Sequence, residues 1–257
     1  MLPPEKGSAA VASFDPNSHP LIRKLESIFR LSDEERDALL NLPMQVTSIR
    51  ADQDIVREGD QPTRCFALLE GFAVPYKMTG GGKRQIMAFY IAGDIPDLQS
   101  LLLKTLDHTI GTLTPCKVGF VQHQHLREIC RRFPRISDAF WRNTLVDAAI
   151  FREWMASIGR RDAYPRIAHV ICEIITKMRA VGLAEDHVVA MPITQGEIAD
   201  ALGLSNVHVN RVLTQLREDG LIEIRRTHVK VPDWERLKEA GDFDPGYLHL
   251  ENEQVAG

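Results

Sequence analysis

The chain lacks long apolar runs, and it has few cysteines. No stretch approaches the roughly 18 apolar residues of a membrane-spanning helix, so we expect no membrane partner. Residues 1–20 lack a basic start followed by an apolar run, so we expect no secretory signal peptide. The 4 cysteines are far apart and form no Cys-x-x-Cys pair. This distribution is typical of reduced intracellular thiols and argues against a disulfide framework.

An excess of positive charge is also missing. The formal net charge is -4 at pH 7, and basic and acidic residues nearly balance between Arg160 and Lys230. A uniformly basic nucleic-acid-binding surface is therefore excluded, and DNA affinity would have to come from a few placed cations. The candidates for this role are Arg211, Arg217, Arg225, Arg226 and Lys230.

The composition is that of a globular chain, with 44% apolar and 26% charged residues. A length of 257 residues allows one large domain or two ordinary ones. Residues 1–18 are rich in Pro, Ser and Ala, which predicts a flexible tail. No nucleophile–base–acid set and no constellation of metal ligands stands out in the sequence. We therefore expect no enzyme activity, no metal and no cofactor.

The stretch from Ile193 to Ile222 predicts two helices joined by a tight turn and followed by a strand. Thr194 suits an N-cap, and Glu197 three residues later completes a capping box. Gly203 supplies the turn because glycine adopts positive φ without steric cost. Ser205 then caps the second helix. The buried face of that helix is expected to consist of Val209, Val212, Leu213 and Leu216.

The opposite face of this second helix carries amides and a guanidinium. These groups suit the reading of base edges in the major groove of DNA. The pattern predicts a DNA-binding helix-turn-helix. The residues expected to contact DNA are Thr194, Gln195, Ser205, Asn206, Val207, His208, Asn210 and Arg211.

Strands are expected to come early in the chain and helices later. After two short helices at 19–30 and 33–42, apolar runs separated by Gly, Asp and Pro predict a small antiparallel barrel or jelly roll. The expected strands are 46–49, 54–56, 65–69, 72–77, 86–90, 109–113 and 117–121. The run Gly80-Gly81-Gly82-Lys83 resembles a phosphate loop, but it lacks the strand–loop–helix context and predicts a hairpin tip.

A long helix is expected over 136–159, with an apolar arc broad enough for two partners. One interpretation is a single buried helix in a monomer core. The other is a dimer helix, which we prefer because helix-turn-helix proteins usually pair across two half-sites. The expected dimer contacts are Phe140, Leu145, Ala148, Phe151 and Met155. A further helix is expected at 165–181, and a two-stranded wing at 221–224 and 229–231.

Taken together, these motifs resemble the Crp/Fnr family of bacterial transcription regulators. The matching residues are IVREGDQPTRCFALLEG from Ile55 to Gly71, the Gly93-Asp94 step and the stretch 193–222. The resemblance implies an α+β fold: an N-terminal antiparallel β jelly-roll barrel like a cyclic-nucleotide-binding domain, a long dimerisation helix and a C-terminal winged helix-turn-helix. It also implies a cytoplasmic homodimer that binds a roughly palindromic double-stranded DNA site and contacts RNA polymerase.

On this basis we divide the chain into five parts. They are the flexible tail (1–18), the sensor barrel (19–134), the dimerisation helix (135–160), the winged helix-turn-helix domain (161–235) and a C-terminal tail (236–257). In the last part, we expect one short helix from Trp234 and then a frayed end.

The barrel departs from the nucleotide-binding pattern of the family. Those members have a glycine–glutamate step and a later arginine–serine pair, where this chain reads GDIPDL from Gly93 and later His108-Thr109. Pro96 removes a backbone donor, and His108 replaces a permanent cation with a group mostly neutral at pH 7. Cyclic AMP binding in the family manner is therefore not expected. The residues of an altered pocket for an unknown small-molecule effector would be Asp97, Leu98, His108 and Thr109.

Oxygen-sensing family members hold an iron–sulfur cluster on three N-terminal cysteines and a fourth at the end of the barrel. Cys116 matches the fourth, but no cysteine precedes Cys65, so no cluster is expected. Cys116 is then either a core residue at a strand end or a redox-active thiol, which would need a lowered pKa and solvent access. His123 and His125 have no convincing third metal ligand and are expected at the entry to a helix.

The recognition helix departs from the family as well. Arg211 matches an arginine whose natural partner is guanine, whereas Val207 replaces a glutamate that would accept from cytosine. Valine suits a thymine methyl, and Asn206 and Asn210 suit adenine or the backbone. We therefore predict a changed half-site and a regulator that needs no ligand or responds to a non-nucleotide one. The alternatives are a small-molecule-binding module, for which a tightly bound metabolite would speak, and a protein-interaction adaptor.

Overall fold

The computed structural model describes residues 19–184 and 187–251. The predicted flexible tail, 1–18, lies outside the described residues. Along the chain come two helices, seven barrel strands, a long central helix and a smaller domain of helices and short strands. Within the described ranges, no helix is long and apolar enough to cross a membrane.

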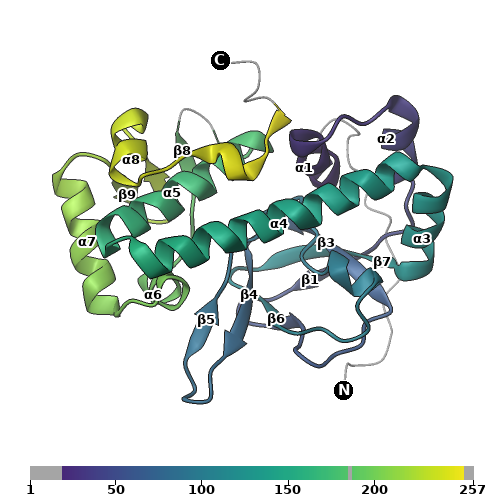
Figure 1. Ribbon diagram of the computed structural model, residues 1–257, viewed down its shortest axis with the longest axis horizontal. Coiled ribbons are helices and arrows are strands. Elements are labelled where there is room, and N and C mark those ends of the chain that lie inside the picture. Colours follow the sequence, from purple (N-terminus) through teal and green to yellow (C-terminus); the bar gives the residue numbers. More distant parts are fainter. Residues whose placement is uncertain (1–18, 185–186, 252–257) are drawn as a thin grey trace.

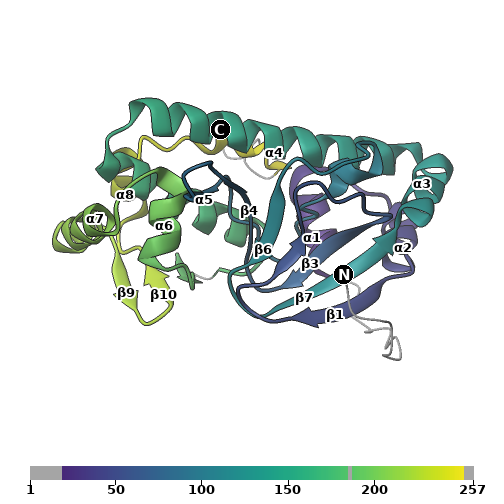
Figure 2. The ribbon, with the colours of Figure 1, turned by 90° about the horizontal axis from the view of Figure 1, so that it is seen from below.

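The barrel consists of two antiparallel sheets, as the sequence predicts. One sheet has the order β1-β7-β3 and the other β2-β6-β4-β5 (Figure 2). Their core is formed by buried side chains such as Phe66, Leu68, Ile110 and Val118. The strand bounds are β1 Gln45–Ile49, β2 Asp54–Val56, β3 Arg64–Glu70, β4 Ala73–Met78, β5 Arg84–Ile86, β6 Thr109–Thr112 and β7 Cys116–Gln122.

The strand expected over 86–90 is mostly absent, because β5 ends at Ile86. Pairing with β4 shifts from Tyr76 opposite Ile86 to an isolated bridge between Ala73 and Tyr90. Pro75 lies between these two pairs and has no N–H to donate, so the regular ladder stops there. The predicted hairpin tip at Gly80–Lys83 is confirmed, since Thr79 N–H donates to the Lys83 carbonyl across it.

Helices close the barrel on one side and lead to the long helix. They are α1 Pro20–Ile28, α2 Asp33–Leu40, the 3-10 turn η1 Leu98–Leu101 and α3 His123–Arg132. Helix α4 then runs over Pro134–Arg160, about 40 Å at the usual rise per residue. It lies along both the barrel and the C-terminal domain (Figure 1). Its inner face is buried, and Trp154 packs edge-on against Phe89 of the barrel at 5.7 Å.

The C-terminal domain is built on α5, Ala163–Ala180, which is buried on most sides. The helix-turn-helix follows as α6 Gln195–Leu202 and α7 Asn206–Glu218. The wing strands are β9 Glu223–Arg225 and β10 His228–Lys230, and a third strand, β8 Val188–Ala190, pairs with β10. The sequence does not predict this third strand, because three residues are too short to show a period.

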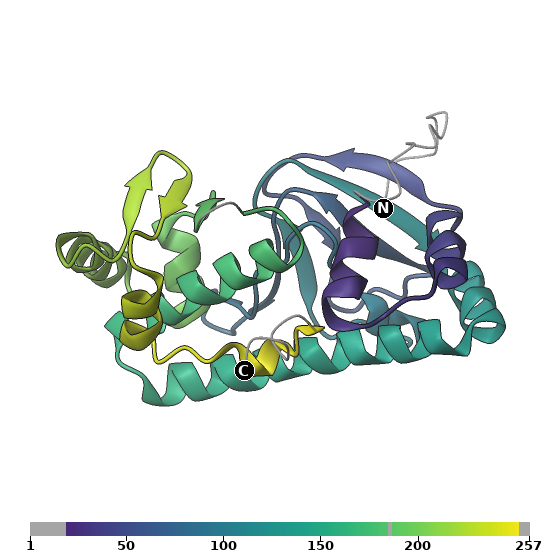
Figure 3. The same ribbon diagram turned by 90° about the horizontal axis from the view of Figure 1, so that it is seen from above.

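The chain after the wing does not fray as expected. Helix α8, Trp234–Ala240, is followed by the 3-10 turn η2, Pro245–Leu248, which packs on α4 (Figure 3). Leu237, Phe243 and Leu248 are buried in the same core as α5. Because these apolar side chains pack against α4 and α5, residues 236–251 are part of the fold. Residues 252–257 lie outside the described residues.

Candidate DNA-binding site and sensor barrel

Local hydrogen bonds cap the starts of α6 and α7, and a glycine forms the turn between them. The Thr194 hydroxyl accepts from Glu197 N–H at 3.2 Å, while Glu197 Oε2 accepts from Thr194 N–H at 2.6 Å. Gly203 ends α6 in the left-handed conformation, with φ 65. The Ser205 hydroxyl then accepts from His208 N–H at 3.2 Å and caps α7. The predicted capping box, turn glycine and second cap are all confirmed.

Helix α7 buries one face and presents the other to solvent. The predicted inner residues Val209, Val212, Leu213 and Leu216 are all buried. On the outer face Asn206, Asn210 and Arg211 are exposed, and Val207 is 81% exposed. An isolated apolar side chain with this exposure suits contact with an external apolar group such as a thymine methyl.

A hydrogen bond between the two helices orients part of this face. Asn210 Nδ2 donates to Gln195 Oε1 at 3.2 Å, which links α7 to the first turn of α6. Sequence reasoning grouped both residues as DNA contacts but missed their mutual bond, because it joins side chains 15 positions apart. The bond leaves the second amide hydrogen of Asn210 and the Asn210 carbonyl to an outside partner.

The candidate cations of the wing are placed differently from one another. Arg225 and Lys230 both lie near Glu223, at 3.9 Å and 3.7 Å, and their side chains remain largely exposed. Arg226 occupies the wing turn with a left-handed φ of 56. Arg217 bends back along α7 and donates to the Thr214 hydroxyl. The wing therefore presents cations beside the recognition helix.

In the barrel, the Gly93-Asp94 step forms a buried ion cluster with two lysines. Asp94 lies 2.9 Å from Lys24 of α1 and 3.5 Å from Lys177 of α5. Burial alone would raise the pKa of Asp94, but the Lys177 and Lys24 ammonium groups hold it below its ordinary value. Lys177 also donates to the Phe89 carbonyl at 2.7 Å. Sequence analysis did not predict this cluster, which joins the barrel to the C-terminal domain.

A second set of contacts joins these two parts. Arg84 of β5 pairs with Asp200 of α6 at 2.8 Å, and Gln85 donates to the Ala201 carbonyl at 2.9 Å. The first helix of the helix-turn-helix is thus held directly against the barrel hairpin.

Only one of the four residues expected in an effector pocket lines the apolar groove beside α4. Leu98 lines an apolar groove of about 670 Å³ between η1, α3 and α4, but Asp97, His108 and Thr109 do not line it. Asp97 is buried, accepts from Phe66 N–H at 2.9 Å, and burial raises its pKa to about 7. His108 Nδ1 is 2.8 Å from Asp107, and the Thr109 hydroxyl accepts from Glu58 N–H. A pocket shared by these four residues stays a prediction.

Cys116 is a core residue at a strand end and lacks the properties of a redox switch. It is 3% exposed, and its thiol donates to the carbonyls of Phe72 and Thr114. Burial raises the pKa of the Cys116 thiol, which is opposite to the requirement for a reactive thiolate. These properties favour the interpretation of Cys116 as a core residue, and a redox role for Cys116 stays a prediction for an oxidation experiment.

His123 and His125 lie at the start of α3, as predicted. His123 Nε2 is 3.0 Å from the Ser100 hydroxyl, and burial lowers the pKa of this imidazole. Among the residues that the structure describes, no three His, Cys, Asp or Glu side chains are grouped as metal ligands would be.

Helix α4 carries an exposed apolar stripe. Met155 is 72% exposed and Trp141 is 61% exposed, with Leu145 and Phe151 also on the surface. Ala148 is half-buried between them. Phe140 differs from the other expected dimer contacts, because it is 5% exposed and packs in the barrel core of its own chain. Its assignment to a partner-facing surface is not supported.

The architecture defines a class of protein: DNA-binding regulators with a cyclic-nucleotide-binding-like barrel and a winged helix-turn-helix. Residues 165–240 match the family model for a Crp-like helix-turn-helix domain, and residues 46–133 match that for a cyclic nucleotide-binding domain. The chain belongs to the Crp/Fnr family, and it is a DNA-binding transcription regulator of this type.

Similar proteins include the transcriptional activator protein FnrL of Cereibacter sphaeroides, 27% identical over 84% of this chain and 88% of FnrL. Transcriptional activator protein anr of Pseudomonas aeruginosa is 22% identical over 79% of this chain and 83% of its own. Among solved structures, FixK2 from Bradyrhizobium japonicum has a TM-score of 0.68 at 23% identity, covering 77% of this chain and 96% of FixK2. The similarity to FixK2 shows a shared fold.

Proposed function

We propose that the chain acts as a homodimer that binds a roughly palindromic DNA site through α7, without cyclic AMP and without an iron–sulfur cluster. The observation that carries this proposal is the outer face of α7, where Val207 and Arg211 lie exposed on a helix that is capped and fixed at its start. Arg211 would bind guanine in bidentate fashion, and Val207 would pack on a thymine methyl. Thr194, Gln195, Ser205 and His208 would contact the backbone or flanking bases.

The exposed stripe on α4 supports the homodimer. Leu145, Ala148, Phe151 and Met155 lie on one side of the helix, at the spacing of a two-stranded seam. Pairing two copies would place their recognition helices about one DNA turn apart. We expect Met155→Glu to shift the protein toward monomer in sedimentation velocity, whereas Lys83→Glu at the barrel hairpin should leave the dimer intact. A monomeric wild-type protein would contradict this part of the proposal.

Two observations support independence from cyclic AMP. The carboxylate of Asp94 is engaged by Lys24 and Lys177, and His108, which replaces the family arginine, lies beside Asp107. Neither position offers a permanent cation to a cyclic phosphate. The cysteines also do not resemble a set of iron–sulfur ligands, because three of the four, Cys65, Cys116 and Cys172, are buried. Titration calorimetry with cyclic AMP should give no heat of binding, and a micromolar affinity would refute this part.

Selection of DNA sites from a random library by purified, reduced protein tests the main proposal, with no ligand added. We expect an inverted repeat whose half-site differs from that of family members with glutamate in place of Val207. Val207→Glu is the matched variant and should recover a cytosine at the corresponding position. Return of the same half-site by both proteins would contradict the assigned role of Val207. In the cell, the protein would act in the cytoplasm and contact RNA polymerase.

A second candidate is a regulator whose unknown small-molecule effector binds at the barrel. The observation that favours it is the apolar groove of about 670 Å³ beside α4, lined by Leu98, Leu101, Phe140 and Trp141. Native mass spectrometry of freshly purified protein would reveal a retained apolar ligand as an added mass. Trp141→Glu should remove that mass if the groove is the site.

A further inference from the structure

The residues that follow α8, Gly241–Glu251, form a strap across α5 and α4, and they lie beyond the segment matched by the family model. At one end, a Cβ added to Gly241 would come within 2.8 Å of the His169 backbone nitrogen, so the strap lies directly on α5. At the other end, Arg142 of α4 donates to the His249 carbonyl and pairs with Glu251 at 3.4 Å. The strap therefore holds both helices.

Between these two helices lies the hinge that connects the barrel side to the DNA-reading domain. Arg161 forms the C-cap of α4, and α5 begins two residues later. The Arg161 guanidinium pairs with Glu153 of α4 at 2.6 Å and with Asp242 of the strap at 3.1 Å. Burial would lower the pKa of Arg161, but these two carboxylates raise it above its ordinary value. The strap is thus bonded to the hinge residue itself.

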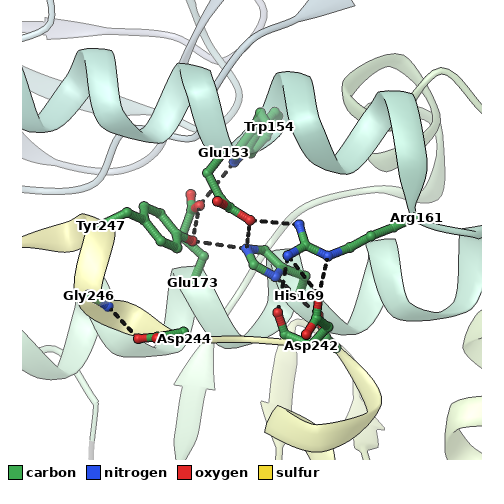
Figure 4. Close-up of polar contacts among 10 residues, drawn as sticks. Glu153, Trp154, Arg161, His169, Glu173, Asp242, Asp244, Gly246 and Tyr247 are labelled. Atoms are coloured by element: carbon green, nitrogen blue, oxygen red, sulfur yellow. Dashed lines mark hydrogen bonds and ion pairs between the residues drawn. The ribbon is translucent and has the colours of Figure 1, made fainter.

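Behind the hinge, buried His169 and Glu173 form a hydrogen-bonded chain with half-buried Tyr247 (Figure 4). His169 Nδ1 is 3.1 Å from the Gly241 carbonyl, and His169 Nε2 is 3.1 Å from the Tyr247 hydroxyl. The Tyr247 hydroxyl is also 2.7 Å from Glu173 Oε2, which accepts from Trp154 Nε1 at 3.0 Å. The strap contributes the carbonyl and the hydroxyl, while α4 and α5 contribute the rest.

The hydrogens in this chain can be counted. A carbonyl only accepts, so His169 Nδ1 must carry a hydrogen. Burial and Glu173 raise the pKa of Tyr247, which therefore has one hydrogen to donate. If Tyr247 donates to Glu173, its contact with His169 is a hydrogen bond only when Nε2 is protonated. If it donates to His169, Glu173 must be protonated. Either arrangement contains one proton more than a neutral imidazole beside an ionised carboxylate.

Charged groups of both signs surround this chain. Glu153 lies 3.7 Å from His169 Nε2 on the α4 side, and Asp242 faces the cluster from the strap. Arg161 at the hinge is a permanent cation paired with Glu153. Lys24 of α1 interacts electrostatically with Glu173, and Lys238 of α8 does so with the buried Cys172 thiol. Glu173 Oε1 is buried and has no hydrogen-bond partner within the described ranges. A buried carboxylate in this position is stabilised by an adjacent imidazolium.

We propose that the strap is a proton-linked positioning element: its closure takes up one proton in the His169–Tyr247–Glu173 chain and fixes the hinge between α4 and the DNA-reading domain. The closed form binds one proton more than the open form, so closure is favoured at low pH and lost as the pH rises. Tyr247 and Asp242 are positioning residues in this scheme. Its consequence for DNA rests on the proposed function.

Hydrogen–deuterium exchange of the full-length protein tests the proposal without DNA. Protection of residues 241–251 and of the hinge 158–164, referred to intrinsic exchange rates, should fall together by up to about tenfold per pH unit between pH 7 and 8.5. Tyr247→Phe, which keeps the ring, and His169→Gln should each reduce this change to less than twofold. The matched control is Tyr76→Phe, which removes a tyrosine–carboxylate bond to Asp54 within the barrel, outside the strap and the hinge, and should keep the wild-type slope.

A wild-type protein with no pH-dependent protection, or an unchanged slope in Tyr247→Phe, would overturn the proposal. Strap opening without a parallel change at the hinge would overturn the positioning role. DNA affinity measured against pH supplies a second readout, in which Tyr247→Phe should differ in slope from the wild type and from Tyr76→Phe. Equal slopes would also overturn the positioning role. Absence of DNA binding at every pH would instead contradict the proposed function and leave the exchange result standing.

Discussion

The outer face of α7 and the Asp94 cluster both carry charged groups, but they use them differently. On α7, Arg211 is exposed, and within the described residues it forms no ion pair. In the barrel, Asp94 is 2% exposed and is engaged by Lys24 and Lys177. The first arrangement leaves a guanidinium available to an external partner. The second arrangement uses its charges to hold the barrel and the C-terminal domain together. It lies at the Gly93-Asp94 step, where the nucleotide-binding pattern of the family has a ligand-binding carboxylate.

The largest effect should come from breaking the internal cluster. Asp94→Ala would remove the carboxylate that pairs with both buried ammonium groups and leave them only the more distant Asp147, and we expect it to lower the free energy of unfolding by about 3–5 kcal/mol. Urea denaturation would measure the loss. Asp200→Ala, which breaks the more exposed pair with Arg84, should cost about 1 kcal/mol or less. Equal losses of unfolding free energy in Asp94→Ala and Asp200→Ala would show that the buried ion cluster stabilises the protein no more than the exposed pair.

Next in size is a pH effect at Asp97, which lies in the same barrel segment. Burial raises the pKa of Asp97 to about 7 in the folded protein, above its value of 3.8 when unfolded. The folded state then binds more protons than the unfolded state between these values, so stability should fall as the pH rises from about 4 to 7. The loss should be a few kcal/mol. Burial also raises the pKa of Asp147 to about 7, so Asp97→Asn should reduce but not abolish the difference in free energy of unfolding between pH 5 and pH 8. Urea denaturation at both pH values would measure it, and an unchanged difference would contradict the role of Asp97.

On the external surface, Arg211→Ala should weaken DNA binding by roughly 10- to 100-fold for each half-site of the dimer, because each copy loses one bidentate contact with guanine. The free energy of unfolding should stay within about 0.5 kcal/mol of the wild type, because the side chain is exposed. Fluorescence anisotropy with the selected site would measure the affinity. Lys83→Ala, at the distant barrel hairpin, provides the control. Unchanged affinity in Arg211→Ala would favour a protein-interaction adaptor over a DNA reader.

The smallest effect concerns Cys116. Because its thiol is buried and its pKa is raised, mild peroxide should leave DNA affinity unchanged in the reduced wild-type protein. Cys116→Ala should cost only about 1 kcal/mol of stability. A drop in affinity on oxidation that disappears in Cys116→Ala would restore the redox interpretation and place a switch on the barrel side of the comparison.

The parts that sequence could predict are those held by neighbours along the chain. The caps at Thr194 and Ser205, the turn at Gly203 and the buried face of α7 depend on spacings of three or four residues. The barrel strands were also predictable, because turn residues separate them. Where a local cue was misleading, as at Pro75, the strand bounds differed.

The parts that were missed depend on distant partners. No local pattern shows that Lys177 reaches Asp94, or that Tyr247 meets Glu173. The same limit explains Phe140, whose place on the apolar arc of α4 did not reveal which of two surfaces it would contact. It also explains the expected pocket, since Asp97 and His108 could be placed together only by knowing the barrel.

Helix α1 shows what this long-range pairing means for the order of folding. Lys24 pairs with Asp94, and Arg23 donates to the Val181 carbonyl, 158 positions later. A nine-residue helix is marginal by itself. At ordinary translation rates its last partners emerge on the order of ten seconds after it. Helix α1 therefore gains its last contacts only after α5 has been made, and until then a nascent barrel has its lysine–aspartate cluster incomplete.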